Sequence, residues 1–199
     1  MKAFGKILIT ILALTVMMGV PGCKKHGKKV IEEPEDETLL GVDADHDGIR
    51  DNVMAKMKKD FYMITPDEFK VLEQNARVFQ EILETKPEDR TGILLARGHL
   101  DDAFNCGITV YGEELNYDNF SVMLTQVRQW YFDNPLRKAA HQEFLIRSRE
   151  YMYQPLNLEG NNTCEFELSP ETLKLIEIRK EIKRRKAEKE EAEKAQAAK

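Results

Sequence analysis

One short stretch of the chain alternates side chains that could together bind a metal ion. Its candidate ligands are Asp43, Asp45, Asp47, Ile49 and Asp51. If the chain turns sharply at Gly48, the three leading carboxylates converge on one point. The backbone carbonyl of Ile49 and the side chain of Asp51 can then join them. Oxygen ligands in this number suit a hard cation such as Ca²⁺, so the segment predicts a calcium site.

The spacing resembles the calcium loop shared by EF-hands, dockerins and thrombospondin-type repeats. It departs from that pattern at loop position 12, where a carboxylate usually completes the shell and Met54 stands here. Water, Asp51 or Asn52 would have to fill that place, so we expect affinity in the roughly micromolar-to-millimolar range. The sequence contains no second such loop, which favours a structural clip over a switch. The alternative is an acidic turn that only caps the helix expected from Asp51.

The first residues predict export. Two lysines and no acid precede an apolar run over residues 7–20, and Pro21, Gly22 and Cys23 follow. The run is shorter than the ~20 residues that a transmembrane helix needs. The three parts are typical of a signal peptide, residues 1–22, that is cleaved before Cys23. An uncleaved anchor, or a signal followed by a chance cysteine, is the alternative.

The residues Val20-Pro21-Gly22-Cys23 resemble the bacterial lipobox, with proline at −2 as a departure from it. The resemblance implies lipid on the Cys23 thiol and an acylated amino group, which together anchor the chain to a membrane. Lys24 at the second mature position resembles the pattern of lipoproteins that reach the outer membrane. In a Gram-negative cell we therefore expect the chain on that membrane, facing the periplasm.

Charge limits the partners of the mature chain. Loss of residues 1–22 removes Lys2 and Lys6, so the formal charge of −5 becomes −7. An acidic chain is a poor match for nucleic acid, whose binding needs basic surface. The expected partners are the membrane, through the lipid, and an envelope protein or peptidoglycan.

With Cys23 lipidated, two cysteines are left, Cys106 and Cys164. Exported domains fold in an oxidising compartment, so these two thiols are expected to form a disulfide. Two separate buried cysteines are the alternative.

Composition divides the mature chain into three parts. Residues 23–42 turn from basic to acidic around Pro34 with little to bury, which indicates a flexible tether. Residues 43–182 form the predicted helical domain, beginning with the calcium loop at 43–54. Residues 183–199 alternate Lys, Glu and Ala, which predicts a charged helical tail that buries nothing.

Helix signals recur throughout the domain. Apolar residues at helical spacing predict helices over 51–61 and 93–106, and Thr65-Pro66 opens another with Glu68 as its capping-box partner. A helix is expected from about Asp118, and others after Asn134-Pro135 and Ser169-Pro170. The alternation at 164–168 predicts a brief extended stretch across the bundle. The fold class is therefore all-α, an irregular bundle of five to six helices. The aromatic residues at 130–132, 151 and 153 are expected in its core, or else lining a groove.

Two short segments, Asp47–Val53 and Asn134–Arg137, resemble loosely a group of uncharacterised secreted bacterial helical proteins. The resemblance implies a calcium loop at the start of the domain and no particular activity.

No nucleophile elbow, phosphate loop, dinucleotide fingerprint or zinc-protease motif occurs in the chain. The favoured function is a non-enzymatic envelope lipoprotein. The alternative is a small hydrolase of envelope polymers that uses His99 or His141 with acids in a cleft, whereas His46 is expected to point outward from the loop.

Overall fold

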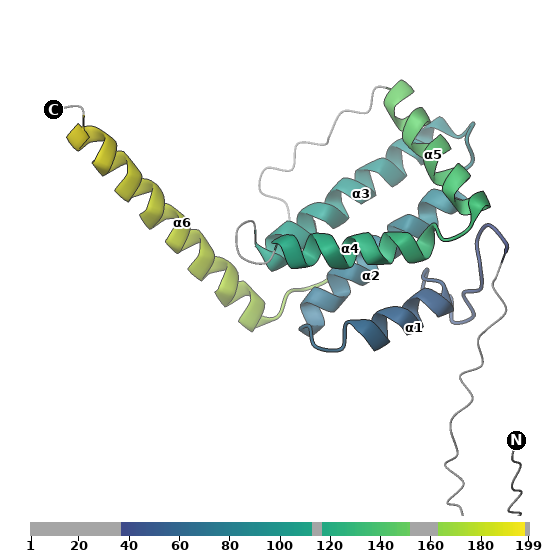
Figure 1. Ribbon diagram of the computed structural model, residues 1–199, viewed down its shortest axis with the longest axis horizontal. Coiled ribbons are helices and arrows are strands. Elements are labelled where there is room, and N and C mark those ends of the chain that lie inside the picture. Colours follow the sequence, from purple (N-terminus) through teal and green to yellow (C-terminus); the bar gives the residue numbers. More distant parts are fainter. Residues whose placement is uncertain (1–36, 113–116, 152–162, 198–199) are drawn as a thin grey trace, which may run out of the picture. The chain divides into compact units, whose positions relative to one another are not determined.

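The computed structural model describes residues 37–112, 117–151 and 163–197, which all belong to one compact unit over 33–199. The described residues contain no strand and form six helices (Figure 1): α1 Asp51–Asp60, α2 Pro66–Glu84, α3 Arg90–Tyr111, α4 Tyr117–Tyr131, α5 Pro135–Glu150 and α6 Pro170–Ala197. The all-α class and the number of helices predicted from the sequence are confirmed.

Three helices begin at prolines preceded by capping side chains, as the sequence predicts. Thr65 accepts a hydrogen bond from the Glu68 N–H at 3.3 Å, and the Glu68 carboxylate accepts one from the Thr65 N–H at 2.8 Å. The Asn134 side chain accepts from the Arg137 N–H at 2.8 Å, and Ser169 Oγ accepts from Thr172. Each cap satisfies an N–H that the first turn leaves free, so these boundaries follow from local chemistry.

Helix α2 lies at the centre of the bundle, against α3 along much of its length and also against α4 and α5. Aromatic rings join these helices. Phe79 of α2 meets Tyr131 and Phe132, with ring centroids 5.7 Å and 5.6 Å away. Both partners are buried, which places these two aromatic residues in the core rather than in a groove.

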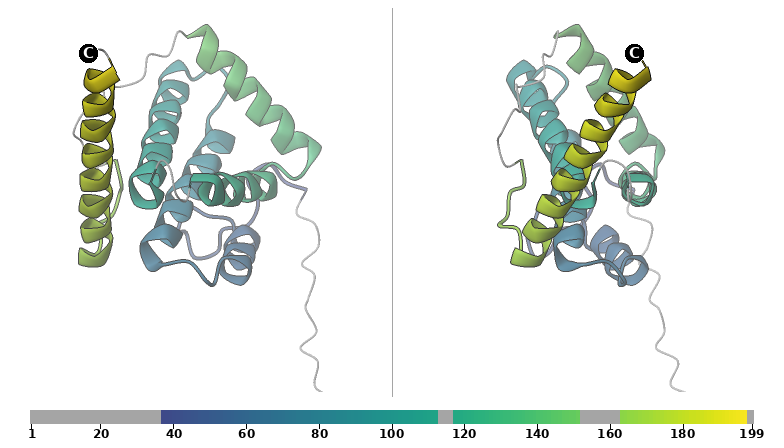
Figure 2. Two further views of the ribbon diagram at one scale, coloured as in Figure 1. Left: turned by 60° about the vertical axis from the view of Figure 1, so that its left-hand side comes forward. Right: turned by 90° about the vertical axis from the view of Figure 1, so that its left-hand side faces the viewer.

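Helix α6 contacts α3 within the first half of its own length and is inclined to it (Figure 2, right). Arg179 donates a hydrogen bond to the Val110 carbonyl at 2.7 Å. The apolar residues Leu173, Ile178 and Ile182 are about half exposed, so α6 packs less closely than its apolar positions predict. Beyond them, residues 183–195 are all exposed.

The segment from Thr163 to Leu168 pairs with no strand in the described part of the chain. The side chain of Gln74 holds it against α2. Gln74 donates to the Thr163 carbonyl at 2.9 Å and accepts from the Glu165 N–H at 3.3 Å. The amide of Gln74 thus takes the place of a neighbouring strand for this stretch. None of the six described helices combines the length and the apolar character that crossing a bilayer requires.

Candidate metal centre

The aspartate segment closes on itself immediately before α1. The Asp51 N–H donates to the Val42 carbonyl at 2.9 Å, and the Ala44 N–H donates to the Asp51 carboxylate at 3.2–3.3 Å. These bonds join the two ends of the loop, so the first helical residue lies beside the residues that precede the loop. Local chain geometry therefore brings Asp51 back to Asp43.

The turn in the middle of the loop needs a left-handed backbone. Gly48 has a φ of 81°, which glycine adopts without steric cost, and His46 has a φ of 58°. The Gly48 N–H donates to Asp43 Oδ2 at 3.0 Å, and the Ile49 N–H donates to Asp47 Oδ1 at 2.8 Å. These bonds hold the turn and leave one oxygen of each carboxylate without a partner inside it.

Asp43, Asp45 and Asp51 converge, each offering a carboxylate oxygen within 4.8 Å of the others. Asp47 is not part of this group, and one of its oxygens accepts from the Ile49 N–H. Ile49 can offer only its backbone carbonyl as a ligand, and its hydrocarbon side chain is buried. Three of the four predicted carboxylates are therefore brought together.

Asp43 Oδ1 is buried and accepts no hydrogen bond from the residues that the structure describes. Leaving a carboxylate oxygen unpaired away from water is costly, and a bound cation would remove that cost. Met54 is buried in the core, in keeping with its lack of a ligand atom at loop position 12. The donor set is thus all oxygen and strongly acidic, which fits Ca²⁺ better than a softer metal.

Two buried arginines lie where the loop meets the bundle, and sequence reasoning missed both. Arg50 and Arg137 are 0% and 1% exposed. Arg50 follows the last predicted backbone ligand, and its Nη2 donates to the Trp130 carbonyl and to Asp133 Oδ2, the latter at 3.3 Å. Its own N–H donates to the hydroxyl of Tyr131. The loop is therefore fixed to the end of α4.

Asp133 holds both arginines, because its other oxygen accepts from Arg137 Nη1 at 2.6 Å. Arg137 Nε also donates to the Leu39 carbonyl at 3.1 Å. Burial raises the pKa of Asp133, but the hydrogen bond from Arg137 and the nearby Arg50 guanidinium outweigh it and hold the pKa below its usual range. The one sequence signal for this cluster was the arginine in each of the segments Asp47–Val53 and Asn134–Arg137.

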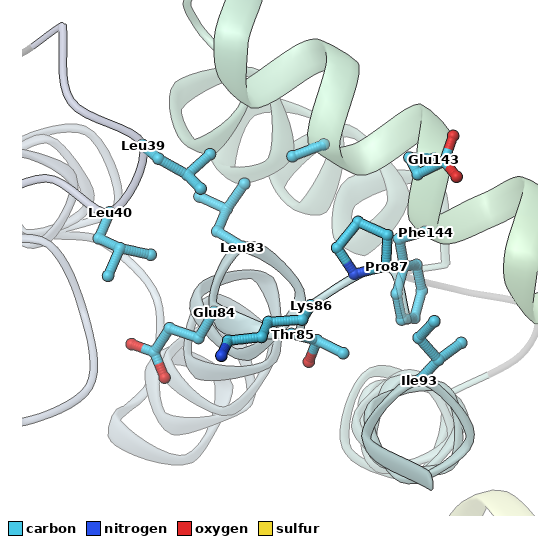
Figure 3. Close-up of a pocket in the computed structure, with 11 residues that line it drawn as sticks. Leu39, Leu40, Leu83, Glu84, Thr85, Lys86, Pro87, Ile93, Glu143 and Phe144 are labelled. Atoms are coloured by element: carbon cyan, nitrogen blue, oxygen red, sulfur yellow. The ribbon is translucent and has the colours of Figure 1, made fainter. Parts of the chain in front are cut away.

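Leu39 and Leu40 lie against the helices, although the sequence predicted a tether as far as Val42. The Leu40 carbonyl accepts from Gln80 at 3.3 Å. Both leucines line a cavity of about 380 Å³ (Figure 3), together with Leu83, Glu84, Thr85, Lys86, Pro87, Ile93, Ala140, Glu143 and Phe144. The helical domain therefore includes residues ahead of Asp43, the predicted start.

The histidines do not gather in this cavity, which no histidine lines. His99 is half exposed, and its Nδ1 lies 2.9 Å from Glu81 of α2. His141 stacks on Phe132 with ring centroids 4.0 Å apart, and burial lowers its pKa. His46 is exposed, as expected for an even loop position. Nothing in the described residues assembles the histidine-and-acid cleft of the hydrolase alternative.

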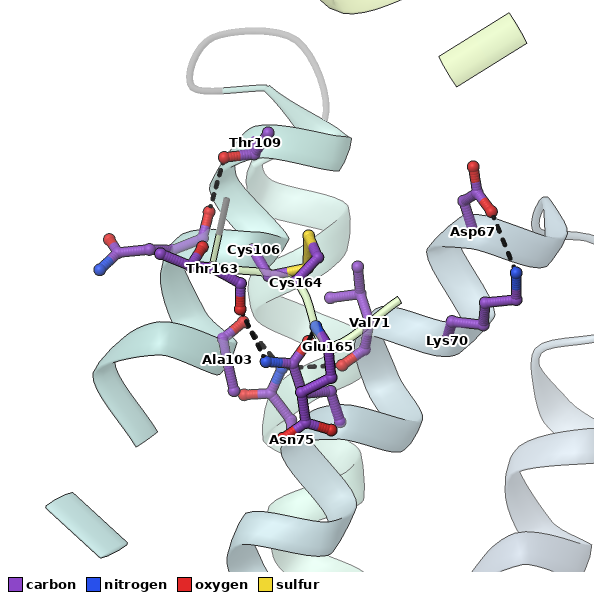
Figure 4. Close-up of a disulfide and its surroundings, with 12 residues drawn as sticks. Asp67, Lys70, Val71, Asn75, Ala103, Cys106, Thr109, Thr163, Cys164 and Glu165 are labelled. Atoms are coloured by element: carbon purple, nitrogen blue, oxygen red, sulfur yellow. Dashed lines mark hydrogen bonds and ion pairs between the residues drawn. A yellow bond between two sulfur atoms is a disulfide. The ribbon is translucent and has the colours of Figure 1, made fainter. Parts of the chain in front are cut away.

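Cys106 of α3 and Cys164 are joined in a disulfide that closes a loop 58 residues long in sequence (Figure 4). Beside it, the Asn75 amide donates to the Val71 and Ala103 carbonyls at 2.9 Å and 3.2 Å. The disulfide and Gln74 together attach the 163–168 segment to α2 and α3. Cys23 and most of the tether lie outside the described residues, as does Tyr153.

Comparison of the chain with known proteins found no matching family model, curated protein or solved structure.

Proposed function

We propose that this chain is an exported envelope lipoprotein, anchored through Cys23, whose helical domain is held at its start by a structural calcium ion. Its role is binding or support within the envelope rather than catalysis. The observation that carries the calcium part is the convergence of Asp43, Asp45 and Asp51, together with the buried Asp43 Oδ1, which accepts no hydrogen bond from the described residues.

The ion would act as a clip. Three carboxylates this close repel one another, and a divalent cation reverses that repulsion. The same loop carries Arg50, which bonds to Trp130 and Asp133. Calcium bound by the loop would therefore stabilise the attachment of the loop, α1 and the Leu39–Val42 segment to the end of α4. Water and the Asp47 and Ile49 oxygens would complete the shell.

Thermal unfolding tests the calcium site. If the free ion is at 100 times its dissociation constant, mass action stabilises the fold by about 2.7 kcal/mol. The melting midpoint should rise between EGTA and ~10 mM Ca²⁺, and Asp45→Ala should abolish the rise. Asp60→Ala, which removes an exposed acid at the other end of α1, serves as the matched control and should keep it. Equal midpoints with EGTA and Ca²⁺ in the wild type would contradict the site.

The anchor has a separate test. In Cys23→Ser, intact mass should show loss of the acyl groups that the wild-type chain carries. A wild-type mass without acyl groups would refute lipidation whatever the calcium result. The expected partners, an envelope protein or peptidoglycan, can be sought by crosslinking in intact envelopes, with a chain lacking residues 184–199 to test the charged tail.

A further inference from the structure

Two consecutive apolar side chains project outward from the turn between α1 and α2. Tyr62 and Met63 are 76% and 80% exposed, more than any other large hydrophobic residue described. The residues on either side of the pair point inward, because Phe61 is buried and Ile64 packs against the core. Single exposed apolar residues are ordinary on protein surfaces. An adjacent pair at the tip of a turn, beside residues that do pack inward, is a more specific feature.

Three lysines flank this pair on the outer side of α1. Lys56, Lys58 and Lys59 are exposed, whereas the opposite side of the helix, formed by Val53, Met54 and Met57, is buried. Between residues 55 and 63 the only acid is Asp60, so the stretch is net positive within an acidic protein. The next acids along the chain are Asp67, which is buried, and Glu68 in the first turn of α2, and Glu73 of α2 lies near Lys58. Basic and apolar groups therefore share one surface.

We propose that the α1 surface, formed by Lys56, Lys58, Lys59, Tyr62 and Met63, docks on an anionic phospholipid bilayer. The proposal rests on the membrane anchoring proposed above. Tyrosine favours the boundary between headgroups and acyl chains, because its ring is apolar and its hydroxyl polar. Lysines on the same side complement anionic headgroups, each strengthening binding by about fivefold near such a surface.

The position of this surface in the chain supports the proposal. The anchored segment joins the domain at Leu39 and Leu40, whose carbonyls accept from Arg137 and Gln80, and the Val42 carbonyl then accepts from the Asp51 N–H at the start of α1. From there α1, a helix of about 15 Å, leads directly to Tyr62. Residues 23–39 can extend to about 55 Å at most, so the surface lies within reach of the bilayer. Tethering gives an effective concentration on the order of millimolar, at which a weak surface suffices.

Photo-crosslinking tests the contact. The full chain is reconstituted into vesicles that carry a phospholipid with a photoactivatable acyl chain, and labelled segments are mapped by mass spectrometry. Segment 60–70 should be labelled at least fivefold more in vesicles containing phosphatidylglycerol than in phosphatidylcholine alone. Segment 139–147 is the control, because it displays the exposed Ile146 without a lysine cluster. Labelling of 60–70 no stronger than 139–147, or equal in both vesicles, overturns the proposal.

Variants test whether labelling depends on the lysine charges or only on the nearness of segment 60–70 to the bilayer. Changing Lys56, Lys58 and Lys59 to Gln should lower labelling of 60–70 at least tenfold in the anionic vesicles. The matched control changes Lys174, Lys180 and Lys189 of α6, which are equally exposed, and should leave it unchanged. Equal labelling in both triple variants, with unchanged melting midpoints, refutes the proposal.

A failure of the proposed lipid anchor is detected by a separate measurement in the same experiment. Acyl groups on Cys23 are detected by mass in the same digest, independently of segment 60–70. Labelled 60–70 without acyl groups would reject the lipid anchor and keep the docking surface, since the apolar run at 7–20 can still hold the chain on the vesicle. Acyl groups on Cys23 without labelling of segment 60–70 would keep the lipid anchor and reject the docking surface.

Discussion

Asp133 pairs with two buried arginines, a role that the residues around it in the sequence do not predict. Its carboxylate lies between the guanidinium groups of Arg50 and Arg137, both fully buried. Within the described residues, Nε and Nη1 of Arg50 have no hydrogen-bond partner. Both buried guanidinium groups donate to this carboxylate, so the stability of the cluster depends on Asp133.

Asp133→Asn should therefore destabilise the protein by about 3 kcal/mol. This is the lower end of the cost of breaking a buried ion pair, because the Asp133 side chain is 35% exposed. Urea unfolding measures the change. Glu165→Gln, which removes the exposed partner of Arg77, is the matched control and should cost about 0–1 kcal/mol. Similar losses in the two variants would contradict a special role for Asp133.

Acid should weaken the same cluster. The pKa of Asp133 is lower in the folded chain than its usual 3.8, so the stabilisation is fully present above pH 3.8 and is lost as pH falls through the folded value. Asp67 behaves alike: burial raises its pKa, but the hydrogen bond from the Ser169 N–H at 2.8 Å, those from the Thr172 and Ser169 side chains and the nearby Lys70 together outweigh it. The free energy of unfolding, measured from pH 6 to pH 2, should fall below about pH 4. In Asp133→Asn this fall should be shallower, and an unchanged slope would argue against the assignment.

The convergence of Asp43, Asp45 and Asp51 was expected from the sequence, whereas the separation of Asp47 from them and the burial of Arg50 and Arg137 were not. Alternating aspartates before a glycine predict a local turn, because the turn at Gly48 and the hydrogen bonds to Asp43 and Asp47 form within a few residues. Arg50 and Arg137 are distant in sequence and meet only in the folded chain. Arginine is rarely fully buried, so a pattern of apolar residues assigns both to the surface.

Among the elements, α3 and α4 are in close contact at Gly107. A Cβ built on this residue would lie 2.1 Å from Cζ of Phe120, well inside contact distance. Phe120 is itself buried and stacks on Tyr111 with centroids 5.0 Å apart. The absence of a side chain at residue 107 is therefore what lets the α4 ring reach α3.

Gly107→Ala should destabilise the fold by roughly 1–3 kcal/mol, as overpacking does, despite the better helix propensity of alanine. Thr109→Ala on the exposed side of the same helix is the control, with a change of about 0.5 kcal/mol or less expected. Denaturant midpoints give both values. A more stable Gly107→Ala variant would show that Phe120 can move aside at no cost.

The starts of α2, α5 and α6 were the most predictable features of the helices. Each is set by a side chain, that of Thr65, Asn134 or Ser169, that accepts from an N–H group in the first turn that follows it. The path of the 163–168 segment was not predictable in detail, since it depends on Gln74 from a distant helix. The weak packing of α6 was not predictable either, because Leu175, Ile178 and Ile182 have the helical spacing of a buried face but lie about half exposed.

For the whole molecule, the disulfide links the chain after α5 back to α3. Closing a loop of this length should contribute about 4 kcal/mol in the chain-entropy account. A Cys106→Ala/Cys164→Ala double variant should lose roughly that amount in chemical denaturation, with α-helical circular dichroism kept in buffer. Reducing agent should lower the wild-type midpoint and leave the double variant unaffected. An equal effect of reductant on both would show that the bond does not act as a cross-link.

The hydrogen bonds at Leu39, Leu40 and Val42 have a mechanical consequence. Any pull on the chain from its N-terminal side reaches Leu39 first, whose carbonyl is held by the buried Arg137, and then Leu40, held by Gln80 of α2. Load is thereby transferred to α5 and α2 before it can unwind α1 from its first turn. A domain held in this way resists tension at its centre rather than peeling from its end.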